Sequence, residues 1–155
     1  MGAREPNFHL IWAIHCERYA SEGHGLAGPP DRDFAERTLR AIADFLEERD
    51  CRCYFHPVPD MARAQKDLFL ELRARGFGIG MHFHCESWRD GAYGKPLGLW
   101  PESEQRRILR DAVLDYEAGL GFRPTSFSAG HFSLPANAYD ILSELGIRQS
   151  SSCLP

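Results

Sequence analysis

Histidine and carboxylate side chains recur at a spacing of two residues in two segments of the sequence. His15 is followed by Glu17, and His82 is followed by His84 and Glu86. Side chains alternate between the two faces of a β-strand, so within each extended segment these side chains point the same way. Neutral imidazoles and carboxylates are the usual ligands of Zn²⁺ and similar divalent ions. The spacing therefore predicts a divalent metal site, expected to hold zinc, in which Glu17 joins His82 and His84.

A site with three protein ligands suits catalysis because it leaves a coordination position open for water. The ion would lower the pKa of that water toward neutrality and so make a nucleophile at physiological pH. His15 and Glu17 are the candidate proton acceptors of such a reaction. His131 follows Gly130 in an expected loop and is either a general acid or a structural residue.

Other histidines and two tryptophans have structural alternatives. His56 ends another expected strand and is interpreted as a hydrogen-bonded structural residue. His24 stands between two glycines and is interpreted as part of a mobile loop. Trp88 and Trp100 belong to a long loop, where they either stack on a sugar ring or anchor the loop.

Strands and helices alternate along the chain and must position these residues. Apolar runs and turn residues predict strands at 8–15, 52–58, 77–83, 125–129 and 147–150. Apolar residues at helical spacing predict helices at 34–49, 61–75, 101–120 and 135–145. The first helix is expected to be capped by Asp33. Its expected apolar face consists of Phe34, Thr38, Ala41, Ile42 and Phe45.

The order βαβαβαβαβ predicts an α/β fold with a parallel sheet, either open and doubly wound or curled toward a barrel. In both architectures active sites form at the C-terminal ends of the strands, where five of the seven histidines fall. No GxGxxG follows the first strand and no GxxxxGK[ST] occurs anywhere. Dinucleotide and P-loop chemistry therefore lack their usual signal.

Length and composition limit the classes of protein that fit. The 155 residues predict a single domain, 1–155, and 18 basic against 22 acidic residues leave a formal net charge of −4. This balance excludes a broad basic surface for nucleic acid, and no apolar run approaches the roughly 20 residues of a membrane span. Five cysteines and an N-terminus without an apolar segment predict reduced thiols in the cytoplasm, with Cys16 and Cys85 in the core. The composition indicates no particular oligomeric state.

Three segments carry a resemblance to a known family. Residues 121–151 read GFRPTSFSAGHFSLPANAYDILSELGIRQSS, and residues 78–88 read GIGMHFHCESW. Together with His15-Cys16-Glu17, these segments resemble the motifs of polysaccharide deacetylases, carbohydrate esterase family four. The resemblance extends from about Leu10 to Cys153, and the segment 121–151 is the most specific of the three.

The resemblance implies a distorted (β/α) barrel and metal-dependent removal of acyl groups, usually N-acetyl, from carbohydrate. Glu17 and His82 match metal-binding positions, and the remaining ligand is either His84 or Glu86. The aspartate that acts as catalytic base in the family is replaced by His15. The family's third motif has an arginine where Ser128 stands and a glycine where His131 stands, and Gln149 replaces a usual aspartate.

Two functions are compatible with this pattern. The first is a metal-dependent hydrolase of non-peptide C–N bonds that deacetylates an N-acetylated carbohydrate or a related small amide, with Trp88 and Ser128 as candidate substrate contacts. The second is a non-catalytic module that binds carbohydrate or a partner on a degenerate deacetylase scaffold. A complete barrel needs roughly 250 residues, so we expect an incomplete barrel that lacks C-terminal strands and leaves its last strand as an exposed edge.

Overall fold

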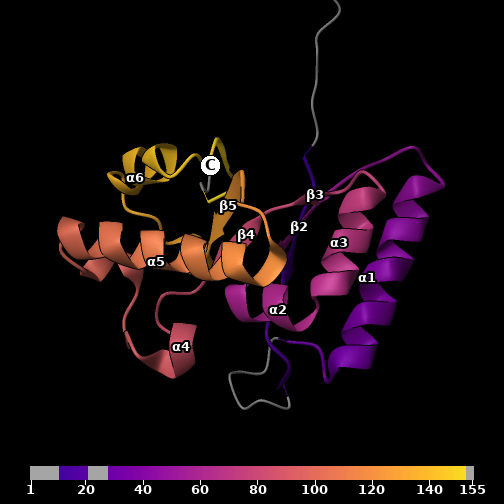
Figure 1. Ribbon diagram of the computed structural model, residues 1–155, viewed down its shortest axis with the longest axis horizontal. Helices are drawn as coiled ribbons and strands as arrows, with labels where there is room; N and C mark the ends of the chain where they lie inside the picture. The colour runs from indigo at the N-terminus through magenta and orange to yellow at the C-terminus, as the bar shows by residue number, and fades with distance from the viewer. Residues whose placement is uncertain (1–10, 21–27, 153–155) are drawn as a thin grey trace, which may run out of the picture.

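The structure is a computed structural model that describes residues 11–20 and 28–152. Its strands are β1 (Ala13–Cys16), β2 (Tyr54–Pro57), β3 (Gly78–Ile79), β4 (Met81–Phe83), β5 (Ser126–Ala129) and β6 (Gln149–Ser150). Its longer helices are α1 (Arg32–Glu47), α2 (Pro59–Ala64), α3 (Lys66–Ala74), α5 (Glu102–Leu120) and α6 (Ala138–Glu144) (Figure 1). Short helical segments are α4 (Trp88–Gly91), η2 (Leu97–Leu99) and η3 (Gly130–Phe132). The alternation of strands and helices confirms the predicted α/β class.

The strands are parallel and follow one another in space in the order of the sequence. One sheet has the order β1-β2-β3 and the other β4-β5-β6. Only Gly80 separates β3 from β4, so one extended segment pairs first with β2 and then with β5. A doubly wound sheet reverses its strand order at a switch point, whereas this order always adds the next strand on the same side. Of the two predicted architectures, the structure therefore has the barrel type, and the described strands do not close.

Glycines make the bend between the two sheets possible. A Cβ atom at Gly80 would lie 2.4 Å from the His56 ring and 2.9 Å from the Ser126 carbonyl oxygen. A Cβ atom at Gly78 would lie 2.3 Å from the Tyr54 ring. Because no side chain fits there, the neighbouring strands approach closely, as expected for a glycine-rich strand.

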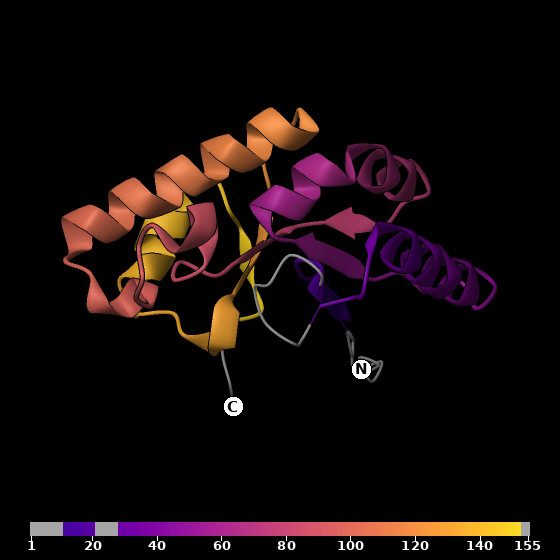
Figure 2. The same ribbon diagram turned by 90° about the horizontal axis from the view of Figure 1, so that it is seen from below.

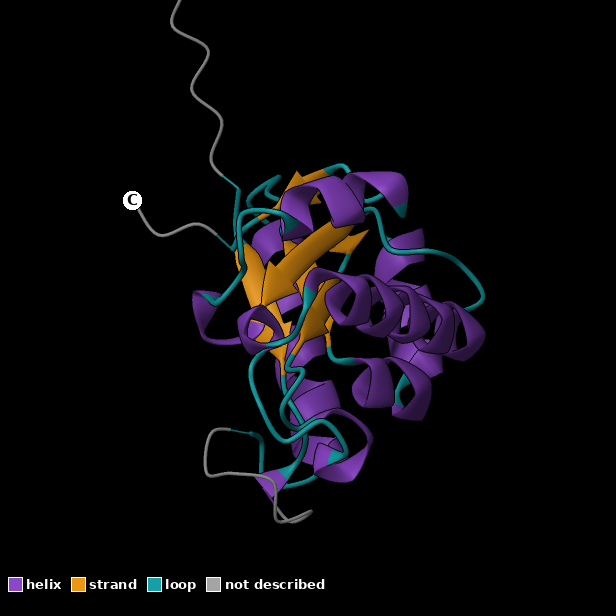
Figure 3. Cartoon of the chain, turned by 90° about the vertical axis from the view of Figure 1, so that its left-hand side faces the viewer, coloured by secondary structure: helices purple, strands orange, loops and turns teal. Residues whose placement is uncertain are grey.

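Helices cover the strands, which run through the middle of the molecule (Figure 3). Figure 2 shows α5, α2 and α3 in a row along one side of the strands. The core face of α5 includes Ile108, Ala112 and Tyr116, all with 0% exposure. The Tyr116 hydroxyl donates to the Gly80 carbonyl oxygen at 2.8 Å, which ties this helix to the bend of the sheet.

Helix α1 differs from its prediction in both its cap and its buried face. Asp31, not Asp33, caps the helix, because its side chain accepts a hydrogen bond from the Phe34 amide. The buried residues are Ala35, Leu39, Ala43 and Leu46, whereas Phe34 and Phe45 are 45% and 52% exposed. The predicted face was therefore wrong in phase, and small alanines rather than phenylalanines meet the core.

Three further boundaries differ from the expectations. Residues 8–10 lie outside the described part of the chain, and Ile11 and Trp12 are 58% and 49% exposed, so the first strand is not buried along its length. The second predicted helix is split at Gln65, whose φ of −116° and ψ of 33° leave the helical region. The predicted loop 85–100 contains α4 and η2. The core positions expected for Cys16 and Cys85 are confirmed, and among the described residues no helix is both long and apolar enough to cross a membrane.

Candidate metal centre

The predicted site residues gather at the C-terminal ends of the strands. His15 belongs to β1, and Glu17 follows that strand by one residue; His82 belongs to β4, and His84 follows it. These side chains line a pocket of about 570 Å³, which also includes Glu86 and His131. A volume of this size is typical of small-molecule sites.

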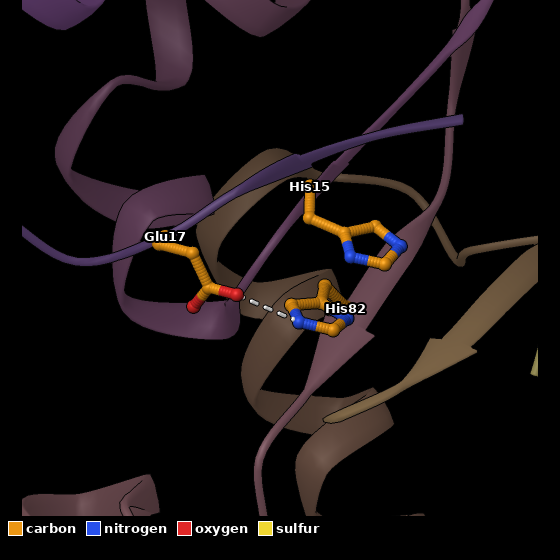
Figure 4. A group of neighbouring side chains, drawn as sticks. All are labelled: His15, Glu17 and His82. Atoms are coloured by element: carbon orange, nitrogen blue, oxygen red, sulfur yellow. Dashed lines mark hydrogen bonds and ion pairs between the residues drawn. The ribbon is translucent and has the colours of Figure 1, made fainter. Parts of the chain in front are cut away.

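Three potential ligand atoms converge at the floor of the pocket. The His82 Nε2 atom lies 2.9 Å from Glu17 Oε1 and 3.0 Å from His84 Nε2. The His84 Nε2 atom lies 3.3 Å from the same Glu17 oxygen. Figure 4 shows the Glu17 carboxylate turned toward the His82 ring, with His15 beside it. The structure thus brings together the three residues that the period-two spacing selects.

The hydrogen bonds on the far side of each ring decide where the protons are. The His82 Nδ1 atom lies 2.9 Å from the Ser128 carbonyl oxygen, which can only accept, so Nδ1 carries the proton. The His84 Nδ1 atom lies 2.8 Å from Glu86 Oε1 and donates in the same way. A neutral imidazole has one proton, so both Nε2 atoms are then bare acceptors that face the Glu17 carboxylate.

This arrangement fits a bound cation. Bare nitrogens and a carboxylate oxygen within 3.3 Å of one another repel unless a proton or a metal ion lies between them. Zinc bonds of about 2.0–2.1 Å in a tetrahedral site place ligand atoms about 3.3–3.4 Å apart, a few tenths of an ångström wider than here. Histidine ligands of metals usually donate their second nitrogen to a carbonyl or carboxylate, as both rings do.

The protonation behaviour of the pocket reflects the same contacts. Burial would raise the pKa of Glu17, but its contacts with His82 and His84 outweigh this and hold the pKa well below its usual range. The hydrogen bond to Glu17, and then that to Glu86, raise the pKa of His84 despite its burial. Glu17 is therefore a permanent negative charge that favours a positive partner.

His15 has a different environment from the other two histidines. Its ring stacks on that of His82, with centroids 4.0 Å apart and planes at 14°. Burial first, and then the neighbouring His82, lower the pKa of His15 to about 4. Its Nε2 atom lies 2.8 Å from the Ser128 hydroxyl. His15 is therefore neutral at pH 7, and in the tautomer that donates Nε2–H to Ser128 its Nδ1 atom can accept a proton.

Three side chains form a second cluster on the rim of the pocket. The Glu86 Oε1 atom lies 2.8 Å from His84 Nδ1 and 3.1 Å from His131 Nε2. The His131 side chain is 71% exposed, whereas those of Glu86 and His84 are 28% and 17% exposed. Glu86 therefore contacts His84 at Nδ1, the ring nitrogen opposite the one that faces Glu17.

The candidate substrate contacts are more buried than expected. Ser128 has 0% exposure and bonds to His15, so its hydroxyl positions that ring and is not available to a ligand. Trp88 is 2% exposed, with Tyr93 stacked on its ring at 5.3 Å and the Arg89 guanidinium 4.3 Å from the ring centroid. These contacts favour the loop-anchoring alternative for Trp88, which also lines the pocket, and its contact with a substrate stays a prediction.

The remaining histidines and Trp100 have simpler outcomes. His56 is 1% exposed and its Nε2 atom lies 2.8 Å from the Ser126 hydroxyl, in agreement with its structural interpretation. Trp100 packs against the core and its indole nitrogen donates to the Lys95 carbonyl oxygen. His24 lies outside the described residues.

Two features of the pocket were missed by the sequence reasoning. Phe132 is 45% exposed at the pocket, with its ring centroid 6.3 Å from that of His15. Arg18 and Asp60 form an ion pair in the pocket wall. Phe132 follows a predicted site histidine, and that position was the only available signal.

Comparisons with known proteins were made by family model, by sequence and by structure. No family model matches the chain, and no curated protein matches it by sequence. A CE4 (carbohydrate esterase family 4) pseudoenzyme from Bacillus anthracis has a TM-score of 0.61 at 12% identity and covers 94% of this chain and 44% of its own. A protein classed as a polysaccharide deacetylase from Mycobacterium smegmatis has a TM-score of 0.65 at 15% identity over 98% of this chain and 54% of its own.

Further solved structures give the same result. The peptidoglycan deacetylase PdaC from Bacillus subtilis has a TM-score of 0.58 at 16% identity, covering 94% of this chain and 59% of its own. A mutant of the B. anthracis pseudoenzyme with restored enzymatic activity has a TM-score of 0.62 at 12% identity, covering 94% and 45%. The chain therefore has the polysaccharide deacetylase fold and spans about half the length of these proteins. The fold expected from the sequence resemblance is confirmed.

Proposed function

We propose that this chain is a metal-dependent amidohydrolase that removes acetyl groups from an N-acetylated carbohydrate. Glu17, His82 and His84 would hold the ion, for which zinc is the first candidate. The observation that carries the proposal is the convergence of Glu17 Oε1 and two imidazole Nε2 atoms within 3.3 Å of one another. When bound, a divalent ion supplies a Lewis acid that polarises a carbonyl group and lowers the pKa of water.

The protein residues around the ion would handle the protons. His15 is neutral at pH 7 and has one ring nitrogen free, so it accepts the proton of the attacking water. The Ser128 hydroxyl holds the orientation of this base. Glu17 is the alternative acceptor, but its low pKa makes it the weaker base.

Proton donation to the leaving nitrogen is assigned to His131. Its side chain is exposed at the pocket, and its Nε2 atom lies 3.1 Å from Glu86 Oε1, which orients the ring. Phe132 offers an exposed aromatic surface to a sugar ring at the same rim. The fold similarity to CE4 deacetylases supports an N-acetylated carbohydrate as substrate class.

The test is acetate release from a panel of N-acetylated sugars and oligosaccharides by the full chain, with and without a chelator. Release that depends on added Zn²⁺, and that His82→Ala and His84→Ala abolish, is the expected result. Glu48→Gln, an exposed carboxylate far from the pocket lining, is the control and should keep full activity. Full metal content in both histidine variants after dialysis would refute the assigned ligands.

A second function, a non-catalytic carbohydrate-binding module, is favoured by one observation. A neighbour in fold is a CE4 pseudoenzyme, and here His15 and Ser128 stand at positions where the resemblance implies an aspartate and an arginine. This alternative requires sugar binding without turnover and without metal dependence. If the unmodified chain releases no acetate, His15→Asp tests whether a carboxylate base restores it, since Ser128 is too buried to accept an arginine.

A further inference from the structure

A second set of ligand atoms lies beside the first and is not used by the proposed metal site. It consists of one atom each from His84, Glu86 and His131, all within 4.8 Å of one another. Glu86 Oε1 is the central atom, at 2.8 Å from His84 Nδ1 and 3.1 Å from His131 Nε2. The rings of His84 and His131 are nearly perpendicular, at 85°, with centroids 4.9 Å apart.

We propose that His84, Glu86 and His131 form a second binding site, which takes a transition-metal dication such as Zn²⁺ or Co²⁺. A set of two imidazoles and one carboxylate binds such ions in preference to Mg²⁺ or Ca²⁺, which favour oxygen ligands. The inference goes beyond the proposed function, because the site can hold an ion whether or not the chain hydrolyses an amide.

The two sites compete for His84, and the structure offers a replacement. Binding through His84 Nδ1 requires that the ring carry its proton on Nε2, which then donates to Glu17 at 3.3 Å. The first ion would then lose His84 but could use His15, because His15, Glu17 and His82 also bring one atom each within 4.8 Å of one another. Each ion then has two imidazoles and one carboxylate, and the two sets share no residue.

The backbone of the loop after β5 holds His131 in place toward Glu86. His131 and Phe132 have φ values of 54° and 51°, a left-handed conformation that is costly for residues other than glycine. Gly130 packs directly on the His84 ring, where a Cβ atom would lie 2.4 Å from Nδ1. The loop thus approaches His84 as closely as the backbone permits, and this brings the exposed His131 to the cluster.

Occupancy of the second site has a consequence that rests on the proposed function. An ion there would take the His131 nitrogen that faces Glu86 and so prevent it from donating a proton, and the move of the first ion onto His15 would also remove the proposed proton acceptor. Hydrolysis should therefore rise as the first ion binds and fall as the second binds. Inhibition of hydrolysis by excess zinc would show that occupancy of the second site suppresses the reaction at the first.

The experiment measures metal stoichiometry, so it does not depend on activity. The full chain and its variants are dialysed against Co²⁺ or Zn²⁺, and bound metal is counted per chain, with the visible spectrum of Co²⁺ as a second readout. We expect two ions in the unmodified chain and one in His131→Ala. Glu86→Gln, which keeps the shape of the side chain but removes its charge, should also bind one. The control Glu48→Gln changes an exposed carboxylate elsewhere and should still bind two.

Two outcomes overturn the second site: one ion in the unmodified chain, or two ions retained in His131→Ala. The variant His82→Ala separates this result from the proposed function, since it removes a ligand of the first site only. A single ion that is lost in His82→Ala and kept in His131→Ala would refute the second site and leave the proposed function standing. Two ions in the unmodified chain and in His82→Ala would count against the assigned first site instead.

Discussion

Replacement of Gly130 by alanine should weaken metal binding by displacing His84. The new Cβ atom would lie 2.4 Å from His84 Nδ1 and 2.6 Å from two carbons of the same ring. Ordinary van der Waals contact begins near 3.4 Å, so the ring or the loop must move by about 1 Å. The ring cannot rotate away freely, because Glu86 and Glu17 hold its two nitrogens.

The substitution should affect two quantities, the affinity for Zn²⁺ and the stability of the metal-free chain. A substitution that disturbs the support of a metal ligand typically lowers metal affinity about 10- to 100-fold, and we expect a loss of Zn²⁺ affinity in that range. Overpacking of a filled interior costs about 1–3 kcal/mol, so the metal-free protein should lose stability by a similar amount. The φ of Gly130 is not in the left-handed region, so backbone strain adds nothing to either term.

Competition with a chromophoric zinc chelator measures the affinity, and urea unfolding of the metal-free chain measures the stability. Gly98→Ala is the matched control: its Cβ atom would meet only the Pro135 ring, at 3.8 Å or beyond, so neither quantity should change. Zinc affinity in Gly130→Ala equal to that of the unmodified chain would refute the placement of His84 as a ligand held against this loop.

Three further predictions concern metal, pH and thiol chemistry. Zn²⁺ at 100 times its Kd should stabilise the chain by about 2.7 kcal/mol and raise Tm by about 5–10 °C in calorimetry, with no shift in His82→Ala. Burial lowers the pKa of His56 from 6.5 to about 4. Between pH 6.5 and pH 4, in the metal-free chain, His56 therefore binds a proton in the unfolded state but not in the folded state. The free energy of unfolding should fall by up to about 3 kcal/mol as the pH drops through this range. Urea titrations of His56→Gln should show a weaker dependence on pH. The exposed Cys51 should react rapidly with a thiol reagent and account for one fast equivalent that Cys51→Ser lacks. Cys85 should react only on unfolding, because burial raises its pKa to about 11; rapid labelling of Cys85 would contradict its packing.

The candidate ligand set of Glu17, His82 and His84 could be predicted from the sequence because it depends on local rules. Strand alternation puts residues at a spacing of two on one face, and parallel strands bring their C-terminal ends to one edge. These rules require no knowledge of loops or of packing. They were enough to select Glu17, His82 and His84, which the structure brings within 3.3 Å of one another.

The rest of the site depends on register and on loop conformation, which local patterns do not report. Ser128 faces His15 because β5 pairs with β4 with His82 opposite Ser128, which places the hydroxyl against the His15 ring beneath the pocket lining. His131 reaches Glu86 only because two consecutive non-glycine residues adopt left-handed φ values. Neither event leaves a signature in composition or periodicity.

The wrong phase of α1 has a similar origin. Its sequence contains two apolar series, one with Phe34 and Phe45 and the other with Ala35, Leu39, Ala43 and Leu46. Side-chain size favours the first series, but the space against the sheet and α3 admits small residues, and Ala43 has 0% exposure. The volume available between α1 and its neighbours, a property of the assembled fold, therefore determines which face of the helix is buried.

The proposed metal site has the most complete set of supporting contacts in the pocket, and this bears on the choice between enzyme and pseudoenzyme. Both ligand histidines have an acceptor on the far nitrogen, Ser128 for His82 and Glu86 for His84, and Gly130 leaves room for the second ring. These contacts orient the two Nε2 atoms toward a carboxylate, an arrangement that needs a proton or a metal ion between them. The residues that differ from the family resemblance include His15, the proposed proton acceptor, and Ser128, which bonds to it. Any loss of function should therefore appear as slow hydrolysis with normal metal binding, and metal content measured beside acetate release would distinguish the two.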